Sequence, residues 1–341
     1  MKIAAGWQMK DRLDTCGVVL QQRTATTGGS WILLDPNNPA GTRDVFPYSG
    51  FNGKVNYDAA TGRLFSSSIS KLYALSLRSR KEELLLELTE EEGIGREVWV
   101  DPLHPSRILF VTHGFSPSKK KGREIAKQRP PDQGSGVTFS YDDYRLKSFD
   151  SDDKRVRELC RFPKDLYSCP TLIGNRFYAA AQPDVILALD LSTGEMRYRE
   201  GQGIRGLTVS HDGELFGWSR AGISRIDFEG EDQIIWSTGE YPSFSKTGAV
   251  AFREEENTLW FAQKGDELTC LISYDEPVNQ SPTADMAWCP CGKHLAAGLT
   301  NHRSQAFTVV ADVERKELMT YSHLGSRAHL GAIWLERGAL A

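Results

Sequence analysis

Short apolar segments rich in small residues recur seven times along the chain. Five of the seven follow a turn that contains Gly or Asn, and another short apolar run lies before that turn. Two apolar runs joined by such a turn predict a β-hairpin, so the sequence predicts one hairpin repeated along its length. The seven small-residue segments are 2–7, 63–68, 107–112, 176–181, 214–219, 258–263 and 294–299.

A second hairpin, in which apolar and polar positions alternate more strongly, follows most of these segments. Residues 185–190 and 195–198 show it clearly, because a polar Ser-Thr-Gly turn separates them. A repeat of four strands, with a small-residue second strand and two amphipathic outer strands, is typical of a β-propeller blade. Segment 81–92 has the composition of a helix, but its place in the repeat favours an outer strand. The predicted innermost strands are 55–57, 98–100, 171–173, 207–209, 249–252, 286–288 and 331–334.

The two ends of the chain together complete one repeat. The last run, 331–334, has no second strand after it, and segment 2–7 has no innermost strand before it. With 18–20 and 31–34 as outer strands, this composite blade predicts a ring closed by three N-terminal strands and one C-terminal strand. The fold class is therefore all-β, a seven-bladed β-propeller of four-stranded antiparallel blades with about 49 residues each. A six-bladed ring with one mispaired segment is the alternative.

Composition agrees with a single globular propeller domain over residues 1–341. The chain is 40% hydrophobic and 25% charged, as in an ordinary globular protein. Its net charge of -4 gives no general attraction to nucleic acid or to an anionic membrane, so both are unexpected partners. The apolar start is too short for a signal sequence, and no apolar run is long enough to cross a membrane. We expect a cytoplasmic monomer with reduced cysteines.

Two turns carry a resemblance to known propellers. Residues 286–298, Met-Ala-Trp-Cys-Pro-Cys-Gly-Lys-His-Leu-Ala-Ala-Gly, resemble the innermost-strand turn of WD40 repeats, and Ser210-His-Asp-Gly-Glu-Leu215 resembles a second copy. Residues 189–195 resemble the outer hairpin of quinoprotein-like and lactonase-like propellers. The chain lacks the Trp-Asp dipeptide and the Gly-His pair of true WD40 repeats, so no close family is assigned. The resemblance implies a propeller and no particular chemistry.

Candidate binding residues lie ahead of the predicted innermost strands. In a propeller these loops, and the loops between second and third strands, open on one face around the channel mouth, where convergent polar groups form ligand sites. A loop face that is merely solvated is the alternative. The binding candidates are Arg43, Asn52, Arg96, Tyr167, Arg205, Tyr241 and Arg327, with Asp44 and Asp165 in the same loops. The candidates for acid, base or metal-ligand roles are Glu97, Asp285 and His329.

Residues 114–136 form an unusual basic insertion. Gly, Pro and Ser lie at both of its ends, and six cations face one anion between positions 119 and 129. We expect a mobile loop that binds an acidic partner or a phosphate, with a solvated disordered loop as the alternative. No aromatic residues interleave with the cations, which disfavours nucleic acid. Its binding candidates are Lys119, Lys120, Lys121 and Arg123. A second, smaller insertion is predicted at 36–53.

Cys289, Cys291, His294 and His302 are residue types that bind zinc. The two cysteines occupy the Ser and Asp positions of the propeller turn, and no second cysteine pair lies nearby in the sequence. We therefore expect no metal site and no cofactor. Residues 92–99 resemble the Glu-Gly-Pro-x-Trp opening of calcium-dependent lactonases, with an insertion and without the Pro, which implies Ca²⁺ or Mg²⁺ as the alternative.

Two functional hypotheses follow. The first is a non-enzymatic propeller that binds a protein or peptide partner through one rim, including the basic insertion. The alternative is a lactonase-like hydrolase or lyase, with or without a divalent metal, that acts on a small molecule at the channel mouth. No Gly-x-Ser-x-Gly motif or phosphate loop is present to favour catalysis.

Overall fold

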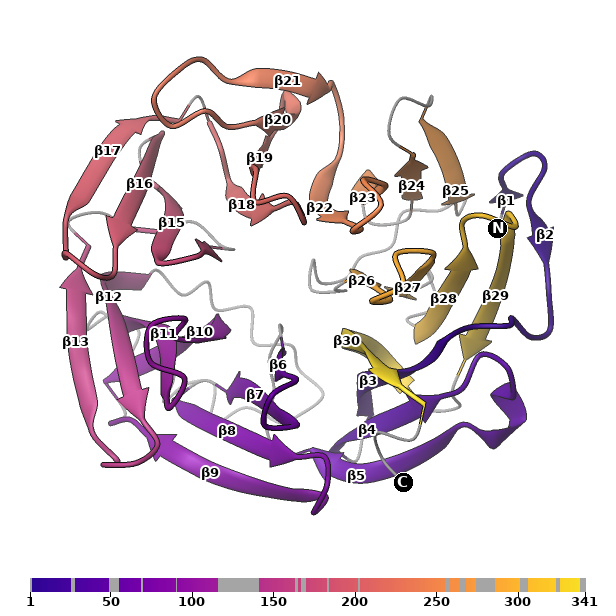
Figure 1. Ribbon diagram of the computed structural model, residues 1–341, viewed down its shortest axis with the longest axis horizontal. Coiled ribbons are helices and arrows are strands. Elements are labelled where there is room, and N and C mark those ends of the chain that lie inside the picture. Colours follow the sequence, from indigo (N-terminus) through magenta and orange to yellow (C-terminus); the bar gives the residue numbers. More distant parts are fainter. Residues whose placement is uncertain are drawn as a thin grey trace, which may run out of the picture.

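A computed structural model arranges the chain as seven antiparallel sheets around a central axis, as Figure 1 shows. The seven-bladed prediction is confirmed, and the six-bladed alternative is wrong. The structure describes residues 2–25, 28–48, 55–68, 70–89, 91–115, 141–162, 165–166, 170–182, 184–201, 203–254, 258–263, 268–273, 286–300, 306–322 and 326–337. Across these ranges the one helix is a 3-10 turn, η1 (Pro39–Gly41), and no helix could cross a membrane.

Each blade is numbered here in chain order, and its strands are given from the axis outward. Blade 1 is β30 (Ser326–Glu336), β3 (Gly17–Ala25), β4 (Gly28–Leu34) and β5 (Arg43–Tyr48). Blade 2 is β6 (Asn56–Asp58), β7 (Arg63–Ser68), β8 (Lys71–Ser76) and β9 (Lys81–Glu87). Blade 3 is β10 (Glu92–Val100), β11 (Arg107–Phe115), β12 (Tyr141–Asp150) and β13 (Val156–Arg161). Blade 4 is β14 (Thr171–Ile173), β15 (Arg176–Ala181), β16 (Val185–Asp190) and β17 (Met196–Glu200).

The remaining blades follow the same order. Blade 5 is β18 (Gly206–Val209), β19 (Leu215–Ser219), β20 (Gly222–Arg225) and β21 (Gln233–Trp236). Blade 6 is β22 (Glu240–Phe244), β23 (Val250–Glu254), β24 (Thr258–Ala262) and β25 (Thr269–Ser273), with β1 (Lys2–Ile3) as a fifth strand. Blade 7 is β26 (Met286–Trp288), β27 (His294–Thr300), β28 (Ala306–Asp312) and β29 (Glu317–Ser322), with β2 (Gln8–Met9) as a fifth strand.

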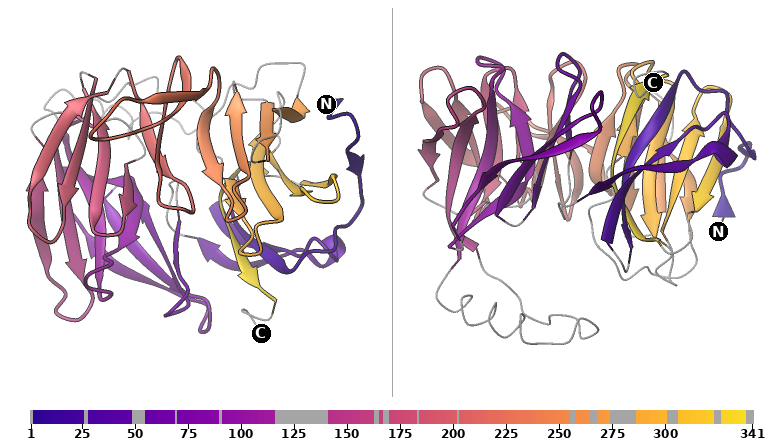
Figure 2. Two further views of the ribbon diagram at one scale, coloured as in Figure 1. Left: turned by 45° about the horizontal axis from the view of Figure 1, so that its top comes forward. Right: turned by 90° about the horizontal axis from the view of Figure 1, so that it is seen from below.

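Antiparallel order within the blades defines two faces of the ring. Connections from the second to the third strand, and from each outer strand to the next blade, lie on one face, which we call the mouth face. Connections from the first to the second strand, and from the third to the fourth, lie on the opposite face. The side view in Figure 2 shows the strands running between these two faces.

The core lies between neighbouring sheets. Phe177, Ala179 and Ala181, on the second strand of blade 4, pack in one buried cluster with Leu109 and Val111, on the second strand of blade 3. Sheets converge toward the axis, so alanines at these positions let them approach while larger side chains fill the wider spaces. This packing explains why small residues recur in the second strands.

The ring is closed in blade 1, where the C-terminal strand β30 pairs with β3 over most of its length. Three N-terminal strands and one C-terminal strand form this blade, as the sequence predicts. Trp334 and Leu335 of β30 are buried, at 5% and 2% exposure, and belong to clusters on the two sides of the sheet. The predicted insertion 36–53 contains β5, the outer strand of this blade, so part of it belongs to the ring.

The position predicted for segment 2–7 is wrong. Residues 2–16 form a strap on the outside of the ring: β1 pairs with β25, and β2 runs parallel to β29 (Figure 1). Gly6, with φ of 82°, turns the chain between the two strands. The second strand of blade 1 is β3 instead, because its fully buried Val19 and Leu20 supply the apolar face that the short polar-flanked segment lacks.

Strand order in blade 6 also differs from the prediction. Residues 249–252, predicted as innermost, belong to the second strand, and 258–263, predicted as second, form the third. The innermost strand is β22, which contains Pro242. An innermost strand pairs on one side only and tolerates a proline there. The Glu-Tyr-Pro-Ser-Phe sequence of β22 hides its strand character.

Candidate functional site

Two predicted binding residues meet at the mouth face. Arg205 precedes β18, and its backbone N–H donates to the carbonyl of Trp218 at 2.8 Å. Tyr241 lies at the start of β22, with its ring centroid 5.0 Å from that of Trp218. The guanidinium of Arg253 lies 5.1 Å from the Tyr241 ring centroid. We call Arg205, Trp218, Tyr241 and Arg253 the mouth cluster, which bridges the innermost strands of blades 5 and 6.

The mouth cluster has a buried base and an accessible edge. Trp218 and Arg253 are only 3% and 6% exposed, whereas Tyr241 is half-buried and Arg205 is exposed. The Trp218 ring lies against Gly206, where a Cβ atom would fall 2.2 Å from it. A cation over an aromatic ring stabilises such a base by about 0.5–2 kcal/mol. The exposed groups therefore sit on a rigid support.

The backbone of Tyr241 is strained. Its φ is 55°, in the left-handed region that a large side chain rarely adopts. Such a conformation costs on the order of 1 kcal/mol or more, persists only where its surroundings hold it, and concentrates at binding sites. The contacts with Trp218 and Arg253 provide that restraint here.

Glu97 lies in the innermost strand of blade 3. Its side chain is 7% exposed. It lies in a stretch of β10 where the pairing register with β11 shifts, between Ile94 and Val98. The Ser67 hydroxyl donates a hydrogen bond to the Gly95 carbonyl in this stretch, at 2.7 Å. Bulges of this kind re-aim side chains next to sites. Of the three candidates for acid, base or metal-ligand roles, Glu97 is the one whose side chain the structure describes.

The foot of the basic insertion is held by ion pairs. β11 ends at Phe115 and β12 begins at Tyr141, so the insertion leaves and rejoins the mouth face. Arg161 donates to Asp143 at 2.6 Å, and Arg145 donates to the other oxygen of the same carboxylate. Both guanidiniums hold the pKa of Asp143 well below its usual range. Residues 116–140, with Lys119, Lys120, Lys121 and Arg123, lie outside the described residues.

The other candidates fall in different places. Arg43 and Asp44 begin the outer strand β5 and lie toward the opposite face, so their predicted place at the channel mouth is wrong, because an outer strand starts on that face. Arg96, Arg327 and His329 lie within innermost strands rather than ahead of them, because β10 and β30 extend farther than their apolar runs indicate. Asp165 is exposed near β14. Asn52, Tyr167, Asp285 and His302 lie outside the described residues.

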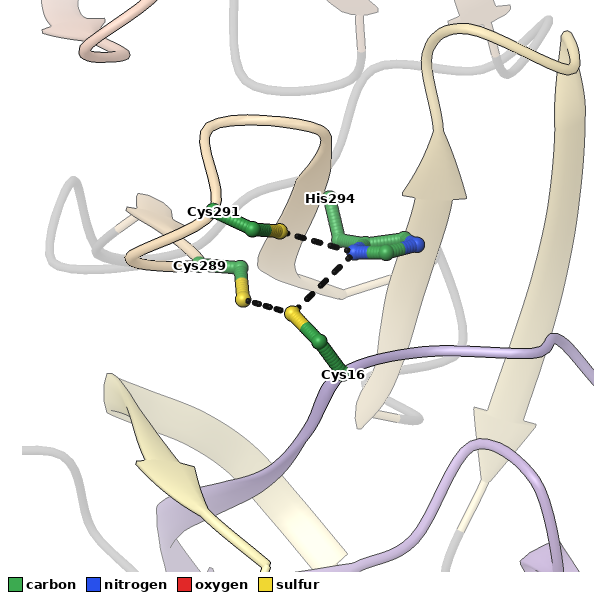
Figure 3. Close-up of side chains that lie close together, drawn as sticks. All are labelled: Cys16, Cys289, Cys291 and His294. Carbon is green, nitrogen blue, oxygen red and sulfur yellow. Dashed lines mark hydrogen bonds between the residues drawn. The ribbon is translucent and has the colours of Figure 1, made fainter.

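Three cysteines and one histidine meet on the opposite face, between blades 7 and 1 (Figure 3). The Sγ atoms of Cys16 and Cys289 are 2.9 Å apart. The Nδ1 atom of His294 lies 3.3 Å from Cys291 Sγ and 3.9 Å from Cys16 Sγ. All four donor atoms lie within 4.8 Å of one another. We call these residues the thiol cluster; its elements are the end of the strap and the turn between β26 and β27.

The thiols of this cluster differ in acidity. Burial raises the pKa of Cys16 and that of Cys289. Burial also opposes ionisation of Cys291, but hydrogen bonds from Cys16, the Lys293 backbone, Cys289 and His294 outweigh it and lower the pKa of Cys291 to about 6. The cluster therefore combines a thiolate at Cys291 with protonated thiols at Cys16 and Cys289.

Sequence reasoning missed members of both clusters. Trp218 and Arg253 end second strands, where an apolar pattern indicates only a core position; the Gly206 opposite Trp218 is the one local signal. Cys16 lies 273 residues before Cys289 in the chain, so no spacing rule could join it to the Cys-Pro-Cys turn. With Cys16, four residues of the types that bind zinc meet at that turn.

Comparison with known proteins supports the fold. No family model matches the chain, and no curated protein sequence matches it significantly. A functionally unknown protein from Desulfotomaculum acetoxidans is similar in structure, with a TM-score of 0.62 and 10% identity over 93% of this chain and 99% of that one. An oligogalacturonate lyase from Vibrio parahaemolyticus gives 0.51 and 10%, over 84% and 89%.

A chain of the mitotic checkpoint complex is also similar, with a TM-score of 0.53 and 9% identity over 80% of this chain and 79% of that one. These matches therefore include an enzyme and a component of a protein assembly, and at such low identity they establish the fold alone. The chain is a seven-bladed β-propeller.

Proposed function

We propose that this chain is a non-enzymatic propeller that binds a protein or peptide partner through the rim of its channel mouth. The mouth cluster carries the proposal. Tyrosine and arginine dominate the binding energy of protein interfaces, and they do so where buried neighbours support them. Tyr241 has that arrangement, with its ring against Trp218 and Arg253, and Arg205 is exposed beside it, with its backbone N–H bonded to the Trp218 carbonyl. A side chain already held in place loses less entropy on binding.

Charge favours an acidic segment as the partner. Arg205 is exposed at the mouth face, and six cations of the basic insertion are connected to strands that end on this face. The Glu97 carboxylate, by contrast, is buried. A positive rim accelerates association with an acidic partner and disfavours a basic one. We expect this binding to take place in the cytoplasm, with the propeller as a monomer.

Replacement of Tyr241 by Ala is expected to weaken partner binding by about 10- to 30-fold, because it removes the aromatic anchor. Tyr241→Phe keeps the ring and should bind within about threefold of the unchanged protein. Tagged variants are used in quantitative pull-downs, and the captured proteins are then titrated individually. Thermal melting checks that each variant is folded.

Arg205→Ala tests the charge, and Arg176→Ala is its matched control. Arg176 is an exposed arginine at the start of β15, on the opposite face. Arg205→Ala and a deletion of residues 118–133 should each reduce capture of the same partners, while Arg176→Ala should not. A partner set that is identical for all of these variants would count against the rim.

The buried Glu97 favours one alternative, a small-molecule hydrolase or lyase with a divalent metal at the channel. In that case Ca²⁺ or Mg²⁺ should raise the melting temperature by several degrees, and Glu97→Gln should abolish the rise, because a ligand that binds the folded state stabilises it. A melting temperature that neither ion changes would exclude this version.

A further inference from the structure

We propose that Cys16, Cys289, Cys291 and His294 bind one zinc ion that fastens the N-terminal strap to the junction of blades 7 and 1. This site is independent of the mouth cluster, which lies on the other face of the ring. Three sulfur donors and one imidazole nitrogen are a ligand set that zinc prefers, and four protein ligands without an open position are typical of a structural site.

The donor geometry fits a tetrahedral ion. Zinc bonds of about 2.3 Å to sulfur and 2.0–2.1 Å to nitrogen place neighbouring donors about 3.5–3.8 Å apart. The distances from His294 Nδ1 to Cys291 Sγ and Cys16 Sγ, 3.3 and 3.9 Å, lie on either side of this range. The Cys16 and Cys289 sulfurs, at 2.9 Å, need to separate by less than an ångström, which a side-chain rotation of the exposed Cys16 can provide.

Asp312 supplies the outer contact that a zinc-bound histidine requires. While Nδ1 of His294 faces the thiols, its Nε2 lies 3.5 Å from the Asp312 carboxylate, and both side chains are 7% exposed. Asp312 is itself held, because its other oxygen accepts the backbone N–H groups of Glu314 and Arg315 at 3.1 and 2.9 Å. A carboxylate behind the imidazole sets its tautomer and orientation in zinc sites.

The same turn in neighbouring blades shows that the fold does not require the cysteines. In blades 5, 6 and 7 the turn is closed by a Gly N–H that donates to the backbone carbonyl of the first turn residue. The distances are 3.1 Å to Ser210, 3.1 Å to Ser245 and 2.7 Å to Cys289. In blades 5 and 6 the serine hydroxyl also accepts backbone N–H groups. A thiol is a weaker acceptor. Where blades 5 and 6 have a serine that stabilises the turn, blade 7 has a cysteine, which stabilises the turn less well but can bind a metal.

Cys16 is presented by a fixed segment. The N–H of the preceding Thr15 donates to the Asn37 side chain at 2.8 Å. Arg337, just beyond β30, donates to the Thr15 carbonyl at 3.0 Å and to the Asp35 carboxylate at 2.8 Å. Arg337 therefore holds the residue that directly precedes Cys16. A ligand held in place before the metal arrives loses little entropy on binding.

Metal content of the full chain, purified without chelators, tests the proposal. We expect about one zinc per chain, and a spectrum typical of tetrahedral thiolate coordination when Co²⁺ replaces it. The double variant Cys289→Ser with Cys291→Thr gives this turn the residues of the Ser245 turn in blade 6, so it should fold while binding less than about 0.1 zinc. Cys160→Ser is the matched control, because this cysteine lies in β13 of blade 3, and it should keep its zinc.

Asp312→Asn provides a second readout that keeps the hydrogen bonds to Glu314 and Arg315. It should weaken zinc affinity by about 10- to 100-fold, as measured by competition with a chromogenic chelator. Removal of zinc should lower the melting temperature of the unchanged protein by several degrees and leave that of the double variant unchanged. A zinc-free protein with no Co²⁺ spectrum, or a disulfide between Cys16 and Cys289 found by mass spectrometry in its place, would overturn the proposal.

Discussion

A chain that ends before Ser326 will not unfold cooperatively, because it lacks the strand that closes the ring. β30 buries Trp334 and Leu335 in clusters on the two sides of blade 1. Loss of a buried tryptophan and a buried leucine costs about 3–5 and 2–5 kcal/mol. Their sum approaches the total stability of about 5–15 kcal/mol that a folded protein has. Calorimetry and near-UV circular dichroism would show the loss of the transition.

Deletion of residues 2–9 is the matched comparison, since it removes the edge strands β1 and β2 and leaves all seven four-stranded blades complete. Ile3 and Trp7 pack on the core only partly. We therefore expect this deletion to lower the melting temperature by a few degrees and to preserve a single cooperative transition. A C-terminal truncation that melts as cooperatively as this variant would show that the ring does not need β30.

Gly222→Ala is expected to destabilise the protein by more than about 3 kcal/mol. Gly222 begins β20 with φ of 113°, where a Cβ atom would lie 2.1 Å from the carbonyl oxygen of Trp236. The atoms it would meet belong to the backbone of blade 5, which cannot rotate away as a side chain can. Urea unfolding followed by tryptophan fluorescence would measure the change.

Gly213→Ala separates the two causes. Gly213 also has a positive φ, 82°, but a Cβ atom there would meet nothing within 4 Å. This variant should lose only the conformational preference of glycine, about 1–2 kcal/mol. Equal losses for the two variants would mean that the collision at Gly222 is relieved by backbone movement.

Local hairpins were predictable because their partners are close in the sequence. In blade 4 the predicted strands 171–173 and 176–181 coincide with β14 and β15. The intervening turn contains Gly174, whose φ of 54° a glycine adopts without strain. Apolar alternation on either side of such a turn defines both the hairpin and its register. Because the hairpin recurs along the chain, this local information is enough to predict the number of blades.

Choices between competing segments were not predictable in this way. Segment 2–7 and the run 18–20 at the start of β3 are both short and apolar, and only the burial of Val19 and Leu20 shows which of them joins blade 1. β22 is a strand despite Pro242 because its position at the axis leaves one edge unpaired. The sequence predicted that Arg205 and Tyr241 lie at the mouth. It could not show that both contact Trp218, because these contacts join different strands of the folded ring.

Hairpin pattern and turn residues act between near neighbours, so they are enough to predict an all-β ring of seven blades closed by its own ends. The position of the strap and the contacts between distant side chains depend on how the whole ring folds. Cys16 and Cys289 are 273 residues apart and become neighbours because β3 pairs with β30 in blade 1, next to blade 7. The separation of the two cysteines in the sequence does not predict their contact, which follows from the way the ring closes.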